Sequence, residues 1–326
     1  MTYLLKRLLE GDRKALSKAI TLVESSREDH QKEANDLLQK VLAQKNRSSI
    51  RIGLSGTPGA GKSTFIEALG TKLIADGHKI GVLAVDPSSK KTGGSILGDK
   101  TRMEKLSREP NAFIRPSPSK LTLGGVTSKT REVILLCEIA GYDVILLETV
   151  GVGQSELAAS EMTDMFCLII TPAGGDELQG LKRGITEIAD LIIVNKADGN
   201  LISTAKMAVA QYSAALRLLG KRENTNEGYP KAAMVSSTIG TGLNEISQEI
   251  FEFIRAQKKV GFFEQRRKNQ EIIWFREKSQ TALFEVLSKN TDLQGIQATL
   301  EDQITNKGLS VFKAIEDFNS NLLKKL

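Results

Sequence analysis

A glycine-rich segment early in the chain has residue types and a spacing suited to holding phosphate groups. Residues 56–64 read GTPGAGKST, which fits G-x-x-x-x-G-K-[ST], with an apolar run before it and a helical stretch after it. Glycines let successive backbone N–H groups turn toward phosphate oxygens, and the following helix adds its positive N-terminal end. We expect Lys62, the catalytic candidate of this loop, to reach the β- and γ-phosphates, and the Ser63 hydroxyl to bind Mg²⁺. The residues expected to bind the nucleotide here are Gly59, Ala60, Gly61, Lys62, Ser63 and Thr64.

A second segment has the chemistry to select a base. The apolar run 191–194 continues into Asn195-Lys196-Ala197-Asp198. The Asp198 carboxylate can accept both the ring N–H and the exocyclic amino group of guanine, whereas adenine lacks that donor pair; such sites discriminate by ~10⁴-fold or more. We expect Asn195 to contact the imidazole edge of the base or to hold neighbouring loops, and the Lys196 stem to cover the base plane. Ser236 and Ser237 end a later apolar run and fit the loop that binds the guanine carbonyl oxygen.

A third segment is suited to bind a metal ion and to respond to the γ-phosphate. The apolar run 144–147 ends in Glu148-Thr149-Val150-Gly151, which has D-x-x-G spacing with Glu in place of Asp. A carboxylate at this position can hold Mg²⁺ through water, and the Gly151 N–H can approach the γ-phosphate. Small GTPases place a water-orienting glutamine directly after that glycine. Here Val152 takes the position and Gln154 is the candidate glutamine, so we expect slow intrinsic hydrolysis.

Two further acidic residues flank a polar, glycine-rich stretch. Asp86 ends the apolar run 80–85, and Asp99 follows in TGGSILGDKTR. Both can approach a phosphate-bound metal from the other side, so the predicted metal ligands are Ser63, Asp86, Asp99 and Glu148. The charged segment 173–183 follows another apolar run and contains two further catalytic candidates, Asp176 and Lys182. Its composition alone indicates a mobile charged loop.

The elements that must position these loops alternate along the chain. Short apolar runs at 50–54, 80–85, 144–147, 166–170, 191–194 and 232–235 are mostly separated by helical stretches. This order predicts an α/β P-loop NTPase fold with a mostly parallel central sheet covered by helices. The apolar spacing before residue 46 and after Gly261 is helical. We therefore expect an N-terminal helical arm at 1–48, a nucleotide-binding domain at 49–258 and a C-terminal helical dimerisation segment at 259–326.

Composition restricts the class of protein. The chain has 326 residues, 40% hydrophobic and 26% charged, with a net charge of +6 and short basic runs. It has two histidines and two cysteines, Cys137 and Cys167, which lie in apolar segments and indicate buried free thiols in a reducing compartment. No stretch approaches the roughly 18 apolar residues of a membrane span. We expect a cytoplasmic protein that binds neither membrane nor nucleic acid.

Taken together, five segments resemble a known family. GTPGAGKST, VDPSSKKTGGSILGDKTRM, ETVGVGQSE, AGGDELQGLKRGI and NKAD are similar to the corresponding segments of the MeaB/ArgK GTPases. These are the G-protein chaperones of adenosylcobalamin-dependent methylmalonyl-CoA mutase, and the similarity runs from about residue 50 to 255. The resemblance implies the metallochaperone branch of P-loop GTPases and a homodimer formed largely by C-terminal helices.

The resemblance also implies functions for individual segments. It assigns Asp86, Asp99 and Glu148 to the metal and switch region, and Asp176–Lys182 to a third switch that reports the nucleotide state to the mutase. In this interpretation the protein hydrolyses GTP with Mg²⁺, gates adenosylcobalamin loading and protects the mutase from inactivation. Methylmalonyl-CoA and isobutyryl-CoA mutases would require the same switch, so the client stays open.

Three other classes of nucleotide-binding protein share some of these features. Partitioning-type ATPases have a second lysine early in the phosphate loop, where this chain has Thr57, and Asp198 favours guanine. A GTPase that assists another metalloenzyme, such as a nickel enzyme, would have His- or Cys-rich segments. A ribosome- or RNA-binding GTPase is suggested by the net charge alone. Co-purification of a cobalamin-dependent mutase, a nickel enzyme or RNA would distinguish these alternatives.

Overall fold

The computed structural model describes residues 2–44, 49–86, 103–118, 129–149, 155–172, 183–218 and 226–325. By its internal contacts the chain divides into two compact units, Met1–Arg267 and Lys268–Leu326. The first unit contains a parallel β-sheet and its covering helices. The second is helical throughout its described residues.

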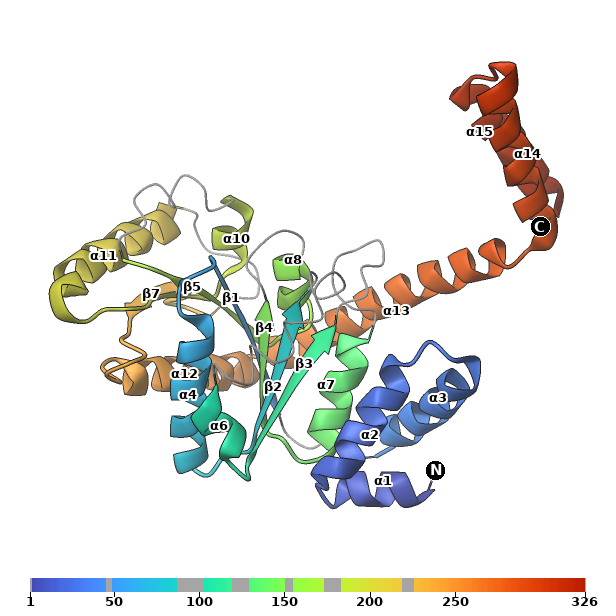
Figure 1. The fold of residues 1–326 in the computed structure, drawn as a ribbon. Helices are drawn as coiled ribbons and strands as arrows, with labels where there is room; N and C mark the ends of the chain where they lie inside the picture. Colours follow the sequence, from blue (N-terminus) through green and yellow to red (C-terminus); the bar gives the residue numbers. More distant parts are fainter. Residues whose placement is uncertain are drawn as a thin grey trace. The chain divides into compact units, whose positions relative to one another are not determined.

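Within the described residues, the sheet has seven strands, all parallel, in the order β3-β2-β4-β1-β5-β6-β7 (Figure 1). The order places β1, whose carboxyl end carries the phosphate loop, in the middle of the sheet. In an open parallel sheet, ligands bind beyond the carboxyl ends of the strands. The strands are β1 (Ile50–Gly56), β2 (Ile80–Asp86), β3 (Ala112–Pro118), β4 (Val144–Thr149), β5 (Met165–Ile170), β6 (Leu191–Val194) and β7 (Lys231–Met234).

Helices cover both faces of the sheet, as expected for strands that are buried on both sides. One face packs on α4 (Lys62–Ala75), α6 (Glu104–Arg108) and α12 (Leu243–Lys259). The other packs on α7 (Thr130–Ile139), α8 (Ser155–Ser160), α10 (Arg183–Ile188) and α11 (Ile202–Leu218), the last preceded by the short 3-10 turn η1 (Gly199–Leu201). Alternate residues of one strand enter the two cores: Leu146 faces the α4 side and Leu147 the α7 side.

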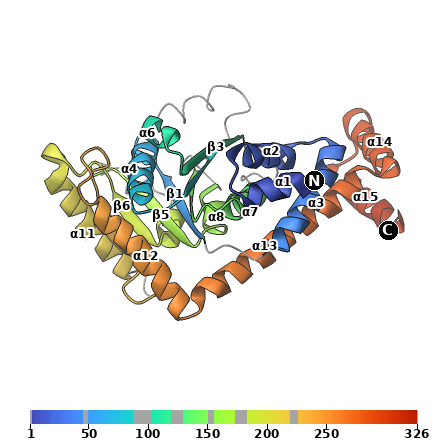
Figure 2. The same cartoon turned by 90° about the horizontal axis from the view of Figure 1, so that it is seen from below.

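The N-terminal arm shares its core with the sheet. Its helices are α1 (Thr2–Leu9), α2 (Arg13–Glu24) and α3 (Glu28–Leu42), and they lie beside α7 in both views (Figures 1 and 2). Leu16, Ile20 and Leu37 are fully buried in the same apolar cluster as the α7 face. Gly11 has a φ of +78°, and Asp12 then caps α2 by accepting the N–H groups of Lys14 and Ala15, which explains the predicted break between the first two helices.

The second unit consists of helices with little buried apolar surface of their own. Helix α13 (Phe262–Ser288) begins in the first unit and continues into the second, where α14 (Thr291–Lys307) and α15 (Val311–Lys325) pack on each other. Large apolar side chains are exposed in the described residues of this unit, including Phe275 at 72%, Phe284 at 66% and Phe312 at 88%.

Candidate nucleotide-binding site

The phosphate loop connects β1 to α4, as predicted. Gly61 precedes the first helical residue with a φ of +86°, a conformation that favours glycine. A Cβ on Gly61 would lie 2.6 Å from the side-chain nitrogen of Asn195, and one on Gly56 would lie 2.0 Å from the carbonyl oxygen of Ile169. These two positions therefore require glycine for space as well as conformation. Because the first N–H groups of a helix have no intrahelical acceptor, the start of α4 offers donors to a phosphate.

Lys62 curls back over the loop that precedes it. Its ammonium donates to the carbonyl oxygens of Gly56 at 2.7 Å and Thr57 at 3.2 Å. The side chain is half-buried, so the charge is held at the mouth of the loop. This geometry supports a phosphate contact from a point charge with several donors.

The predicted serine and glutamate of the metal site lie against each other. The Ser63 hydroxyl, on the first turn of α4, donates to Glu148 Oε1 at 3.2 Å. Glu148 lies near the end of β4, with its side chain on the α4 face of the sheet, and is 9% exposed. Hydroxyl and carboxylate oxygens are the donors that Mg²⁺ prefers, so this pair fits the ion.

Asn195 connects the base-binding segment to the phosphate loop. Its amide nitrogen donates to the Ala60 carbonyl at 2.9 Å, and its amide oxygen accepts from the Ser237 N–H at 3.2 Å and the Ser237 hydroxyl at 2.6 Å. The side chain is 1% exposed. One buried amide thus joins three loops, from the ends of β1, β6 and β7, as the loop-holding role requires; its contact with the base stays a prediction.

Asp198 is oriented by hydroxyl groups of the loop after β7. The Ser236 hydroxyl donates to Asp198 Oδ2, and Thr238 Oγ1 donates to the same oxygen at 3.2 Å. Ser236 was predicted in the loop that binds the guanine carbonyl oxygen, whereas no role was predicted for Thr238. The run of three hydroxyl residues, Ser236-Ser237-Thr238, was the available signal.

Lys196 has the backbone conformation that turns the chain beyond β6. Its φ is +58°, a left-handed value that is uncommon for a residue other than glycine, and its side chain is exposed. The neighbouring Ala197 N–H donates to the Val235 carbonyl at 3.1 Å, which ties this turn to the end of β7. The exposed stem of Lys196 is therefore available to cover a base.

For the other predicted site residues the structure gives the position in the fold but no contact with another site residue, or does not describe them. Asp86 is the last residue of β2, in register with Pro118 on β3. Thr64 is exposed on the first turn of α4, and Gly59 lies in the loop with a φ of +83° and open space around it. The predicted residues outside the described part of the chain are Asp99, Gly151, Gln154, Asp176 and Lys182. In the described part, no group of three or more His, Cys, Asp and Glu side chains is placed to hold a metal ion.

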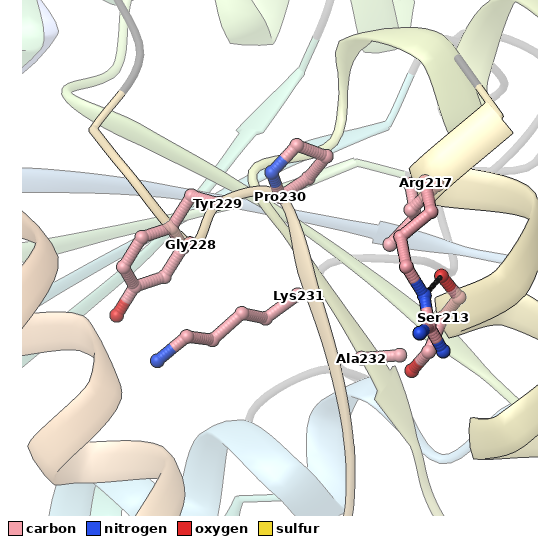
Figure 3. A pocket seen from close by; sticks show the side chains of 8 residues that line it. Ser213, Arg217, Gly228, Tyr229, Pro230, Lys231 and Ala232 are labelled. Atoms are coloured by element: carbon pink, nitrogen blue, oxygen red, sulfur yellow. Dashed lines mark hydrogen bonds between the residues drawn. The ribbon is translucent and has the colours of Figure 1, made fainter. Parts of the chain in front are cut away.

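A cavity of about 490 Å³ lies away from the predicted nucleotide residues, at the β7 edge of the sheet (Figure 3). Residues of α11, of the turn before β7 and of β7 itself line it. The polar groups at one side are used internally: Glu249 accepts from Lys231 at 2.7 Å and from the Tyr229 hydroxyl at 2.5 Å. Burial, and then the hydrogen bond to Glu249, raise the pKa of Tyr229 far above its ordinary value. None of the predicted nucleotide residues lines this cavity.

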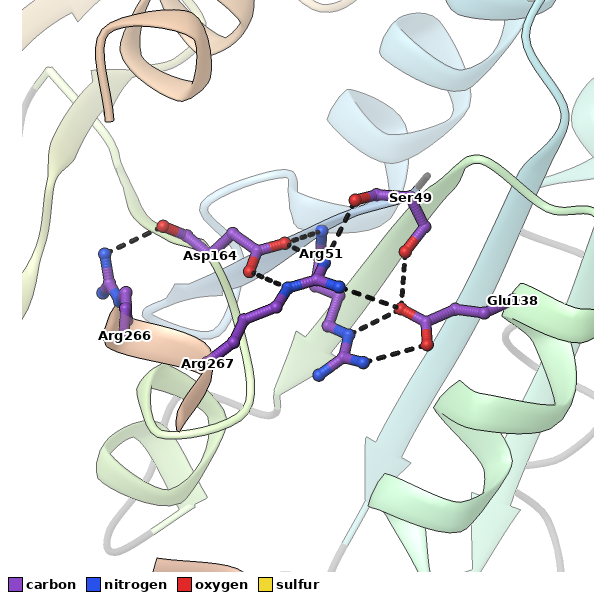
Figure 4. A network of polar contacts seen from close by, with 6 residues as sticks. All are labelled: Ser49, Arg51, Glu138, Asp164, Arg266 and Arg267. Carbon is purple, nitrogen blue, oxygen red and sulfur yellow. Dashed lines mark hydrogen bonds and ion pairs between the residues drawn. The ribbon is translucent and has the colours of Figure 1, made fainter. Parts of the chain in front are cut away.

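A network of charged side chains lies at the amino ends of the strands, on the side of the sheet opposite to the nucleotide loops (Figure 4). Arg267 donates to Asp164 Oδ1 and Oδ2 at 2.8 and 2.7 Å and to the Ser49 carbonyl at 3.0 Å. Arg51 donates to Glu138 Oε1 and Oε2 at 2.7 and 2.9 Å. Burial acts to lower the pKa of Arg267, but the hydrogen bonds and charge of Asp164 outweigh it, so the pKa is raised and the guanidinium stays charged.

Arg266 extends this network to a second strand. Its guanidinium donates to the Asp164 carbonyl at 2.8 Å and to Asp190 Oδ2 at 3.2 Å. Asp164 and Asp190 directly precede β5 and β6. The first turns of α13 are therefore fixed to the edge of the sheet that faces away from the nucleotide loops.

The remaining sequence predictions concern thiols and membranes. Cys137 and Cys167 are free and buried, as predicted, and burial raises the pKa of each thiol far above its ordinary value. Of the helices in the described ranges, none combines the length and apolarity needed to cross a bilayer. The cytoplasmic location stays a prediction.

Comparison with known proteins identifies the family. The model of the family described as "Methylmalonyl Co-A mutase-associated GTPase MeaB" matches residues 16–292. The chain belongs to the MeaB family. It is 46% identical to "Methylmalonic aciduria type A homolog, mitochondrial" of Mus musculus, over 95% of this chain and 76% of that protein. It is 45% identical to "GTPase ArgK" of Escherichia coli (strain K12), over 88% of this chain and 86% of that protein.

A solved structure gives the same result for the fold. The crystal structure described as "LAO/AO transport system kinase" superposes with a TM-score of 0.76 at 35% identity, covering 99% of this chain and 97% of that chain. The P-loop α/β fold, with its N-terminal helices and C-terminal helical extension, is thereby confirmed. This MeaB-family member is a GTPase, and its family is associated with methylmalonyl-CoA mutase.

Proposed function

We propose that this GTPase is a chaperone of an adenosylcobalamin-dependent acyl-CoA mutase, with methylmalonyl-CoA mutase the first candidate. In this proposal it gates loading of the cofactor into the mutase and protects the mutase from inactivation. The observation that carries the proposal is the family match, which runs from residue 16 to residue 292 and so includes most of the arm, the sheet and the start of the C-terminal unit.

The joined loops support two separate subsites for the nucleotide, one for the base and one for the phosphates. Asp198 would accept the two guanine donors, while the loop from Gly56 to Ser63 would hold the phosphates with its N–H groups and the Lys62 ammonium. Because Asn195 bonds to the loops on both sides, the base and phosphate subsites would keep a fixed separation. A fixed separation favours a nucleoside di- or triphosphate over free guanine or free phosphate.

Mg²⁺ would be held by Ser63 and Glu148, which already lie 3.2 Å apart. Asp86 and Asp99 are the further candidate ligands from the following segment. When bound, the ion would neutralise charge on the β- and γ-phosphates. The protein would thus supply only oxygen ligands, from the serine hydroxyl and the carboxylates, as Mg²⁺ prefers.

Hydrolysis would be slow in the isolated protein and faster with the client. Val152 stands where small GTPases have their catalytic glutamine, and Gln154 is the nearest replacement. We propose that Asp176–Lys182 is a switch that senses the client, and that Lys182 brings a cation to the γ-phosphate. Arginine fingers in other GTPases accelerate hydrolysis by ~10³–10⁵-fold, which is the order of effect such a cation can have.

The domain organisation in this proposal keeps the sequence boundaries, with 259–326 as the dimerisation segment. Phe275, Phe284 and Phe312 are more than half exposed within the second unit. Apolar side chains that recur along a helix are stable when another surface covers them. A second copy of the same segment would supply that surface.

Single-turnover GTP hydrolysis with and without purified methylmalonyl-CoA mutase tests the proposal. We expect the mutase to accelerate hydrolysis by the wild type and to lose most of that effect with Lys182→Ala, while basal turnover changes little. Arg183→Ala is the matched control, because it removes the adjacent cation. Equal stimulation of wild type and Lys182→Ala would exclude Lys182 from the mechanism, and absence of stimulation in every variant would exclude this mutase as the client.

A further inference from the structure

We infer that Thr238 is a specificity-determining residue of the base site, acting by orienting the Asp198 carboxylate toward the 2-amino group of guanine. The inference rests on the proposed role of Asp198 in guanine recognition. It assigns Thr238 as a positioning residue, with no contact of its own to the nucleotide.

The geometry that carries the inference is a small array of hydroxyl groups on one carboxylate oxygen. Thr238 Oγ1 lies 3.2 Å from Asp198 Oδ2 and 3.2 Å from Ser236 Oγ, and Ser236 Oγ also donates to Asp198 Oδ2. The Ile239 N–H donates to Ser236 Oγ at 3.2 Å, which directs the Ser236 hydroxyl hydrogen toward the carboxylate. Both hydroxyls therefore act on the same side of Asp198.

The loop backbone holds this array in place without help from packing of Thr238. The Ser236 N–H donates to the Thr241 carbonyl at 2.9 Å, and the Gly240 N–H donates to the Ser236 carbonyl at 2.8 Å, so the loop closes on itself. Ser236 is 1% exposed, whereas the Thr238 side chain is exposed. Because the exposed Thr238 side chain fills no space in the core, what it adds to this loop is the hydroxyl group that contacts Asp198 and Ser236.

Orientation of a carboxylate matters more for guanine than for hypoxanthine. Guanine presents two parallel donors, the ring N–H and the 2-amino group, and binding both requires the two carboxylate oxygens to lie in the plane of the base. Hypoxanthine lacks the amino group and requires one oxygen. Hydroxyl groups that fix Oδ2 thus reduce the conformational freedom lost on two-point binding, and they help GDP more than IDP.

The test is a comparison of GDP and IDP affinity, measured by calorimetry, in wild type and Thr238→Val. Valine keeps the branched shape and removes the hydroxyl. We expect the ratio of GDP to IDP affinity to fall by about three- to tenfold. This is less than the full contribution of a hydrogen bond to a charged group, because the Ser236 hydroxyl still donates to Asp198. Thr238→Ser should restore the ratio. Thr241→Val is the matched control, since Thr241 is exposed in the same loop and its carbonyl is retained.

A double-mutant cycle with Asp198→Asn separates the inference from the function on which it rests. Asp198→Asn alone should weaken GDP binding and favour XDP, because xanthine presents an acceptor where guanine presents its amino group. In that background Thr238→Val should leave the GDP to IDP ratio unchanged.

Each other outcome overturns a defined part of this picture. If Asp198→Asn leaves base selectivity unchanged, the assigned base site is wrong and the role of Thr238 is wrong with it. If Asp198→Asn changes selectivity but Thr238→Val weakens GDP and IDP equally, or changes neither, the base site stands and Thr238 has no part in specificity.

Discussion

Replacing Asn195 with alanine tests whether one amide holds the nucleotide loops together. The substitution removes three short hydrogen bonds, to the Ala60 carbonyl, the Ser237 N–H and the Ser237 hydroxyl, at 2.9, 3.2 and 2.6 Å, and a longer one to the Gly61 carbonyl at 3.4 Å. A hydrogen bond contributes a net ~1 kcal/mol, so the three together are worth about 3 kcal/mol. Ala60 is fully buried, so its carbonyl would lose its hydrogen-bond partner without gaining one from bulk water. The loss of about 3 kcal/mol is therefore a lower bound.

This loss is measured as a sum of two terms. The loss in unfolding free energy of the nucleotide-free protein, from urea denaturation, adds to the loss in GDP binding free energy, from calorimetry. If all of it appears in binding, GDP affinity falls by roughly 100-fold. Asn226→Ala is the matched control, because it removes one amide hydrogen bond, to the Phe253 carbonyl at 2.9 Å, outside these loops. A summed loss below about 1 kcal/mol in Asn195→Ala would refute the reasoning.

Three further predictions concern the phosphate loop and the C-terminal helices. Lys62→Ala should keep the fold and lose ~1.5–3 kcal/mol of GTP binding or the equivalent turnover, since one charge-assisted phosphate contact is removed; calorimetry that finds full affinity, together with normal hydrolysis, would exclude this role. Light scattering should find the full chain dimeric and a chain ending at Arg267 monomeric. A full-length monomer at micromolar concentration would contradict the proposed dimer. A chain ending at Gly261 should in addition be less stable, by ~3–5 kcal/mol, because Asp164 would be left buried without its guanidinium.

Much of the fold was predictable because apolar runs in parallel sheets are buried on both faces. Six predicted runs correspond to β1, β2, β4, β5, β6 and β7. The seventh strand, β3, was not predicted, since Arg115, Pro116 and Pro118 interrupt its apolar character. It is an edge strand of the described sheet, where one row of backbone groups needs no partner strand and proline is tolerated.

The candidate site was predictable where the chemistry depends on consecutive residues. The glycines and Lys62 of the phosphate loop, and the run from Asn195 to Asp198, carry their spacing in the sequence. The contacts between loops were not predictable in the same way, because they depend on how far apart the ends of β1, β6 and β7 lie. For this reason the sequence allows two roles for Asn195, and no role can be assigned from it to Thr238.

The ion pairs of Arg267 also bear on how a change in the nucleotide loops could reach the C-terminal helices. They hold the first turns of α13 at the amino ends of the strands, whereas Asn195 joins loops at the carboxyl ends. The seven residues of β1 separate these edges by about 20 Å, at roughly 3.3 Å per residue. A strand buried on both faces is a stiff element, with few alternative positions. A signal from the nucleotide loops to α13 would have to cross that length of sheet, whereas an external partner that contacts those loops directly would receive it over a far shorter path.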